Sequence, residues 1–270
     1  MKSAITIALV PQIKSGPWVF WENLEDSVVK AAALGFDAVE LFTVSATAVD
    51  TSLLQQLSET YRIRICAVGT GAGKVIQGLT LTDPDAGVRA RAIEFISEMI
   101  DFGAAFNAPA IIGSMQGNIP QGTERTIALQ WLSEGISLLA DKAKKKGVAL
   151  IYEPLNRYET NISNCFADAI AWLKMLDTNN IKLLADLFHM NIEEASIPET
   201  IYQYGSYIGH VHFADSNRRA MGMGHTNMND IAKALRYISY NGYISAEVFP
   251  WPNSDAAARQ TINAFNTWFK

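Results

Sequence analysis

Eight short apolar segments recur along the chain, and this repetition restricts its possible folds more than any other feature. They lie at 5–10, 37–42, 64–70, 108–114, 148–155, 181–188, 207–213 and 243–249. Most are rich in valine, isoleucine and aromatic residues, and several are apolar almost throughout. Such runs indicate strands that are covered on both faces, as in a parallel sheet.

Longer amphipathic segments separate these runs and predict helices. Four of them lie at 24–35, 83–106, 124–147 and 229–242. The first ends in a glycine, which suits the position just after a helix, and the second begins with acids that stabilise a helix N-terminus. The third ends in a lysine cluster, which suits the negative end of the helix dipole.

Alternation of strand and helix predicts the architecture. Eight such units within 270 residues favour a (β/α)8 TIM barrel, folded as a single domain over residues 1–270. An open, doubly wound α/β sheet is the rival fold. It is disfavoured because no GxGxxG or Walker-type loop follows an early strand.

The composition narrows the classes of partner. Apolar residues make up 49% and charged residues 18% of the chain, which is typical of a globular protein. Because 22 basic residues face 27 acidic ones, for a net charge of −5, we expect no nucleic-acid partner. No apolar run approaches the roughly 18 residues of a membrane helix, so we expect no membrane partner.

The N-terminal run and the cysteines suggest a compartment. The run is short and reads as a first strand rather than a signal peptide. Cys66 and Cys165 lie far apart and form no CxxC pair, so we expect two buried free thiols. Both observations favour a cytoplasmic protein.

Ionisable residues stand at the ends of the last four predicted strands. They are Glu153, Asp186, His212 and Glu247. The C-terminal ends of barrel strands converge on one face, where barrel enzymes carry their chemistry. Each residue has apolar neighbours, so its burial would be costly without a partner or a metal ion. Three carboxylates and one imidazole suit a divalent ion such as Mn²⁺, Mg²⁺ or Co²⁺.

Two histidines share the seventh predicted strand. His210 and His212 are two positions apart, so both side chains point to the same side of the strand. If that side is the barrel interior, His212 lies nearer the mouth. We therefore expect His210 to be a hydrogen-bonded core residue rather than a further ligand.

Four motifs stand out in the second half of the chain: EPLNRYET (153–160), DLFHMNIEE (186–194), GHVHFADSNRR (209–219) and GYISAEVF (242–249). Taken together, they resemble those of the ketose 3-epimerases, the D-tagatose and D-psicose 3-epimerase group of the xylose isomerase-like barrel superfamily. The likeness covers nearly the whole chain. It implies an isomerase that acts on a ketose sugar, free or phosphorylated, and that forms a homodimer or homotetramer.

The resemblance also implies roles for individual residues. One divalent ion, with Mn²⁺ expected first and Mg²⁺ or Co²⁺ as alternatives, would be held by the four residues named above. Glu153 and Glu247 would also serve as the acid/base pair, removing and returning the C3 proton through a cis-enediolate. Glu159, His189 and Arg218 would contact the substrate oxygens.

Other interpretations remain open. An inosose dehydratase or isomerase, or a hydroxypyruvate isomerase, would share the ligand set, and a sugar-binding barrel without catalysis is the contrasting class. Gly222 and Gly224 could bind a phosphate, although a simple turn is favoured. The roles of His225 and Trp251 are not assigned.

The aromatic wall of the substrate pocket is another open point. The first strand supplies no aromatic residue, so Trp18 and Trp21 in the following loop, or Met115 after the fourth strand, are expected to take this place. Phe213 and Phe249 are expected in the core.

Overall fold

The computed structural model describes residues 1–13, 15–21 and 23–270. Within them, eight parallel strands close into a barrel in sequence order. The strands are β1 (Lys2–Leu9), β2 (Ala38–Thr43), β3 (Arg64–Gly69), β4 (Ala110–Ile112), β5 (Leu150–Tyr152), β6 (Ile181–Asp186), β7 (Ile208–His212) and β8 (Tyr243–Ala246). Pairing of β1 with β8, in which Ile5 lies opposite Ala246, closes the sheet. The predicted barrel is confirmed.

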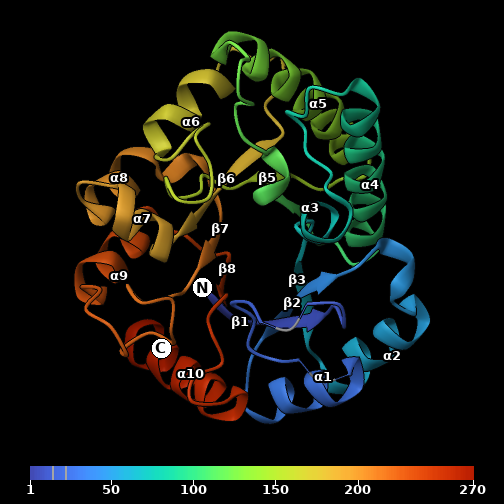
Figure 1. Cartoon of the computed structure of the whole chain (residues 1–270). Coiled ribbons are helices and arrows are strands. Elements are labelled where there is room, and N and C mark those ends of the chain that lie inside the picture. The colour runs from blue at the N-terminus through green and yellow to red at the C-terminus, as the bar shows by residue number, and fades with distance from the viewer. Residues whose placement is uncertain (14, 22) are drawn as a thin grey trace.

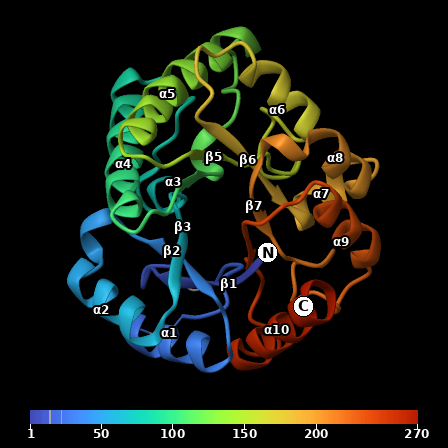
Figure 2. The ribbon, with the colours of Figure 1, turned by 180° about the vertical axis from the view of Figure 1, so that it is seen from behind.

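Helices surround the strands on the outside (Figures 1 and 2). The α-helices are α1 (Leu24–Ala33), α2 (Thr51–Tyr61), α3 (Ala72–Gln77), α4 (Ala86–Ala104), α5 (Arg125–Lys145), α6 (Phe166–Leu173), α7 (Leu187–Glu193), α8 (Ile197–Tyr204), α9 (Met228–Tyr237) and α10 (Ser254–Phe269). Short 3-10 turns occur at η1 (Ala46–Ala48), η2 (Ser114–Gln116) and η3 (Gly205–Tyr207). The four helices predicted from amphipathic spacing correspond to α1, α4, α5 and α9.

Side-chain caps explain where several helices begin. Asp50 accepts the backbone N–H groups of Ser52 and Leu53 at the start of α2, and Asp85 accepts that of Gly87 at the start of α4. These bonds satisfy donors that the first helical turn cannot pair internally.

Strand alternation divides the interior into two regions. One set of side chains, including Ile7, Leu41 and Tyr152, packs outward against the helices in the main hydrophobic core. The alternate set fills the barrel and contains polar residues as well as apolar ones. Glu40 and His210 belong to that inner set and are 4% and 1% exposed. This buried polar layer lies beneath the site described below.

Both cysteines are free, as expected, although only Cys66 is buried and Cys165 is partly exposed. Cys165 is the residue directly before α6. Among the helices of the described residues, none has the length and apolar character needed to cross a membrane.

Candidate active site at the C-terminal mouth of the barrel

Four ionisable side chains converge where the last four strands end. Asp186 and His212 are the last residues of β6 and β7, and Glu153 and Glu247 directly follow β5 and β8. One potential ligand atom from each lies within 4.8 Å of the other three. Because parallel barrel strands end at the same face, residues that are far apart in the sequence meet there. The structure thus brings the four residues together, while their role as metal ligands stays a prediction.

His212 lies at the centre of this cluster. Its Nδ1 is 3.2 Å from Asp186 Oδ2 and 3.5 Å from Glu153 Oε1. A third carboxylate oxygen, Glu247 Oε2, lies 3.6 Å away. Burial disfavours a charged imidazole, but the carboxylates of Glu40 and Glu247 raise the pKa of His212 well above its usual value. The surroundings therefore stabilise a positive charge at this point.

The two carboxylate oxygens of Asp186 face different groups. Oδ1 accepts the backbone N–H groups of Phe188 at 2.7 Å and His189 at 3.1 Å, and so caps α7. Oδ2 faces His212. Burial opposes ionisation, but nearby His189 and His212 lower the pKa of Asp186. The helix N-terminus thus orients an ionised carboxylate toward the centre.

Glu247 differs from Asp186 in its protonation. Burial, reinforced by the charges of Glu153 and Asp186, raises the pKa of Glu247 to about 7, despite the lowering effect of His212 and Arg218. Like charges held this close cannot all ionise at neutral pH without a compensating cation. The four-residue cluster therefore lacks the positive charge that would allow all of its carboxylates to ionise.

Glu153 reaches the cluster across a glycine. A Cβ at Gly113, directly after β4, would lie 2.5 Å from Glu153 Oε2. Glu153 Oε1 and His189 Nε2 are 3.8 Å apart, and both are buried without a hydrogen-bond partner among the described residues. Buried polar atoms without a partner are rare and indicate a place for a ligand. The unpartnered Glu153 oxygen, the carboxylates of Asp186 and Glu247 and the His212 imidazole together fit a divalent ion.

His189 lies beside the four-residue cluster, on α7. Its Nδ1 accepts the backbone N–H of Asn156 at 3.2 Å and lies 2.7 Å from the Asn156 amide nitrogen. Because Nδ1 acts as an acceptor, the ring proton sits on Nε2, which faces Glu153 and Asp186 at 3.8 Å each. His189 therefore presents an N–H donor to the interior of the mouth.

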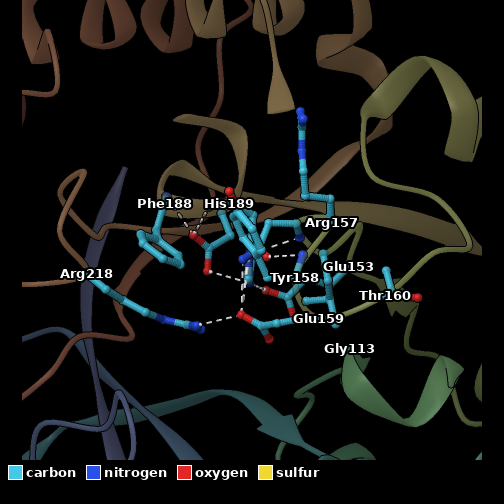
Figure 3. Close-up of polar contacts among 12 residues, drawn as sticks. Gly113, Glu153, Arg157, Tyr158, Glu159, Thr160, Phe188, His189 and Arg218 are labelled. Atoms are coloured by element: carbon cyan, nitrogen blue, oxygen red, sulfur yellow. Dashed lines mark hydrogen bonds and ion pairs between the residues drawn. The ribbon is translucent and has the colours of Figure 1, made fainter. Parts of the chain in front are cut away.

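Arg218 joins two of the predicted site carboxylates. Its Nη1 lies 3.2 Å from Glu159 Oε1, and its Nη2 lies 2.7 Å from Glu247 Oε2. The guanidinium also stacks on the Phe188 ring, 4.9 Å from its centroid. In Figure 3 the Arg218 side chain extends toward Glu159, and His189 lies close to Glu159. Only 13% of the Arg218 side chain is exposed, so this is not an ordinary surface ion pair.

Two residues of this region were not predicted from the sequence. Asn156 organises the EPLNRYET loop, because its amide donates to Glu159 Oε1 at 3.1 Å and its backbone N–H holds His189. Glu40 contacts His212 from below. An acid inside the apolar run at 37–42 was a signal for the latter, since buried carboxylates require partners.

The residues predicted for the wall of the substrate pocket or for the core are only partly where they were expected. Trp18 stacks on Phe42 with the ring centroids 4.0 Å apart, at the C-terminal ends of β1 and β2. Met115 and Phe213 are fully buried. The prediction that Phe249 belongs to the core is wrong, because 42% of this residue is exposed. It follows the end of β8, where strand alternation no longer determines its direction.

A cavity of about 960 Å³ lies beside the mouth, between the end of β1 and helices α1 and α2. Trp21, Leu24, Leu53 and Phe249 contribute to its lining. Among the residues that the structure describes, those lining this cavity do not include the seven predicted site residues.

Two backbone N–H groups of the glycine-rich loop after β7 form hydrogen bonds within the loop. Asp215 is 1% exposed and accepts the backbone N–H groups of Gly222 and Gly224 at 2.7 and 2.8 Å. These donors are therefore not available to a phosphate. His225 in the same loop is exposed. Trp251 is 46% exposed and stacks against the Arg219 guanidinium at 4.0 Å.

Comparison with known proteins shows extensive similarity. The model of the family described as xylose isomerase-like TIM barrel matches residues 28–268. A D-psicose 3-epimerase from Agrobacterium fabrum is 32% identical over 228 residues, which cover 82% of this chain and 78% of that relative. An L-ribulose 3-epimerase from Methylomonas sp. is 29% identical over 259 residues, 94% of this chain and 88% of that protein.

A solved structure extends this similarity to three dimensions. The D-psicose 3-epimerase from Clostridium cellulolyticum H10, crystallised with D-tagatose, superimposes with a TM-score of 0.81 at 25% sequence identity. The alignment covers 99% of this chain and 98% of that protein.

Proposed function

The chain belongs to the xylose isomerase-like TIM barrel family, and from this premise we propose that it is a divalent-metal-dependent ketose 3-epimerase. The resemblance to ketose 3-epimerases predicted from the motifs is confirmed, and the chain is an isomerase of the epimerase class. The observation that carries the proposal is the convergence of Glu153, Asp186, His212 and Glu247 within 4.8 Å. When bound there, a divalent ion would act as a Lewis acid that stabilises negative charge on the substrate oxygens.

We propose that Glu153 and Glu247 transfer the proton at C3. They follow β5 and β8, which are separated around the barrel by β6 and β7, so they approach the centre from different sides. Epimerisation requires one group to remove a proton and another to deliver one to the opposite face. Without a metal ion the pKa of Glu247 is about 7, and a bound cation would lower it, which favours the ionised form that a base requires near neutral pH.

Arg218, His189 and Glu159 are proposed to hold the substrate oxygens. The Arg218 guanidinium and the His189 Nε2–H are donors that stabilise charge as it develops on an oxygen. The Glu159 carboxylate is an acceptor for a hydroxyl group. A free ketose is favoured over a phosphorylated one, because Asp215 occupies the backbone donors of the loop after β7.

The proposal is tested with a panel of free and phosphorylated ketoses assayed with Mn²⁺, Mg²⁺ or Co²⁺. Epimer formation and solvent deuterium incorporation at C3 are followed together. We expect Mn²⁺ to support conversion of a free ketose. Glu153→Gln and Glu247→Gln should each reduce turnover by about 100-fold or more. Glu134→Gln, on the exposed face of α5, is the matched control and should retain activity.

Full activity in both site variants would contradict the proposed acid/base roles. Binding of a ketose without deuterium exchange in the wild-type protein would instead favour a sugar-binding barrel. Loss of water from an inosose, or turnover of hydroxypyruvate alone, would favour the related lyases and isomerases. The expected homodimer or homotetramer stays a prediction, which sedimentation of the same samples checks.

A further inference from the structure

Glu40 lies in the middle of β2, inside the barrel, and the proposed acid/base and substrate roles do not use it. The residue is 4% exposed, and in the strand register it lies opposite Thr6 of β1 and Ala67 of β3. A carboxylate in this position has lost its contact with water, so it must be paired within the protein. The residues that pair with the Glu40 carboxylate therefore indicate its role.

Both oxygens of the Glu40 carboxylate contact a histidine from β7. Oε2 lies 2.8 Å from His210 Nε2, and Oε1 lies 3.1 Å from His212 Nε2. The two imidazole rings are 5.5 Å apart and nearly perpendicular, so each edge is directed at its own oxygen. Glu40 thus bridges the histidine at the mouth and the one a layer deeper.

This bridge constrains which ring nitrogen of His212 carries a proton. An ionised carboxylate only accepts hydrogen bonds, so Nε2 of His212 must donate to it. When the ring is neutral, as a metal ligand must be, Nδ1 then holds the lone pair. Nδ1 is the atom that faces Asp186, Glu153 and Glu247. A histidine ligand with its other nitrogen hydrogen-bonded to a carboxylate is oriented and made more basic toward a metal ion.

We propose that Glu40 is a positioning residue that holds His212 in the Nε2–H tautomer with Nδ1 turned toward the metal centre, and that His210 keeps Glu40 in place. The inference rests on the metal centre of the proposed function and adds to it a residue from the opposite side of the barrel. His210, which was expected to be a hydrogen-bonded core residue, has that position.

The alternative that Glu40, His210 and Cys66 form a second metal site is less compatible with the contacts. Their potential ligand atoms lie within 4.8 Å of one another. However, both Glu40 oxygens are already engaged with histidine nitrogens, so a second ion would have to break these hydrogen bonds. One metal ion per chain is therefore expected.

The first test measures Mn²⁺ binding by calorimetry and by electron paramagnetic resonance. Glu40→Gln keeps the shape of the side chain but offers one oxygen and one N–H₂ group, so it cannot accept from both histidines. We expect its Mn²⁺ affinity to fall by about 10- to 100-fold. Cys66→Ala changes the same buried layer without touching either Glu40 hydrogen bond and should leave the affinity unchanged.

The second test needs no variant. In ¹⁵N-histidine-labelled wild-type protein saturated with a diamagnetic divalent ion, Mg²⁺ or Zn²⁺, two-bond ¹H–¹⁵N correlation reports the tautomer of His212. We expect a proton on Nε2 and metal on Nδ1. A metal-bound His212 with its proton on Nδ1, or an unchanged Mn²⁺ affinity in folded Glu40→Gln, would overturn the inference.

The two tests also separate this inference from the proposed function. Wild-type protein that binds one Mn²⁺ and loses no affinity in Glu40→Gln retains the metal centre and excludes the positioning role. Wild-type protein that binds no divalent ion excludes both. Two ions per chain, with the second lost in Cys66→Ala, would assign Glu40 to a second metal site instead.

Discussion

Arg218 and Glu247 form an ion pair at the mouth of the barrel, with 2.7 Å between Nη2 and Oε2. The guanidinium is largely enclosed and also contacts Glu159. A fixed positive charge next to Glu247 opposes the effect of burial and of the neighbouring carboxylates on its pKa. Arg218 thus links Glu159, which is proposed to bind substrate, to Glu247, which is proposed to transfer the proton.

Replacement of Arg218 by leucine should move the pH profile. Arg218 lowers the pKa of Glu247, so its loss raises that pKa further. A base works only when ionised, and the acidic limb of kcat/KM should therefore shift to higher pH. The rate itself should fall by about 100- to 1000-fold. Arg219→Leu is the matched control, because Arg219 stacks on Trp251 rather than on Glu247. Coincident profiles for wild type and Arg218→Leu would refute this coupling.

A methyl group at Gly113 should disturb the metal centre. The added Cβ would lie 2.5 Å from Glu153 Oε2, so the carboxylate must move. A displacement of about 1 Å in a site of this kind can lower the rate about 100-fold, and we expect weaker Mn²⁺ binding as well. Calorimetry and steady-state kinetics of Gly113→Ala measure both effects.

Gly147→Ala provides the control for this substitution. Gly147 has a φ of +76° and no atom within 4 Å of an added Cβ. Alanine there should reduce the free energy of unfolding by about 1–2 kcal/mol through backbone strain, with Mn²⁺ affinity unchanged. Equal losses of affinity in the two variants would attribute the Gly113 effect to general destabilisation.

Asp215 should stabilise the loop that carries Arg218. Burial opposes its ionisation, but the backbone N–H groups of Thr226, Gly224 and Ser216 lower the pKa of Asp215 below the usual 3.8. Asp215→Asn should therefore reduce the free energy of unfolding by about 1.5–3 kcal/mol at pH 7.

The pH dependence of this effect has a definite sign. A lowered pKa contributes stability that is complete above the unfolded-state value and is lost as the pH falls through the folded-state value. The difference between wild type and Asp215→Asn should therefore narrow below about pH 4. Urea unfolding from pH 7 down to pH 3 measures this difference in the free energy of unfolding. A difference that widens in acid would contradict the stabilising role of the ionised Asp215 carboxylate.

Removal of the metal should affect both activity and stability. Chelation should abolish turnover, and addition of Mn²⁺ should restore it. Because the ion binds the folded chain, a concentration 100 times the Kd should stabilise it by about 2.7 kcal/mol. Thermal unfolding with and without Mn²⁺ tests this, with Asp186→Asn as the variant expected to lose the increase. Full turnover after exhaustive chelation would rule out metal dependence.

The barrel and the central four residues were predictable for one shared reason. Parallel strands place their C-terminal ends on one face, so the position of Glu153 or Asp186 at the end of an apolar run already indicates where the side chain lies. The same reasoning placed His210 below His212, since strand alternation is a local property.

Residues outside regular strands were harder to predict. Phe249 follows β8 and is exposed instead of buried, because the periodicity of two ends with the strand. The orientation of His189 depends on Asn156, whose contact crosses from the β5 loop to α7. Neither arrangement has a sequence period.

By itself, the sequence determined the closed eight-stranded barrel and the group of acids and histidine at its mouth, because both follow from local periodicity and from the common direction of parallel strands. Only the tertiary structure revealed the contact between Glu40 and the two histidines of β7. Barrel closure brings β2 and β7 to face each other across the interior, and this proximity arises from the curvature of the whole sheet rather than from any local pattern.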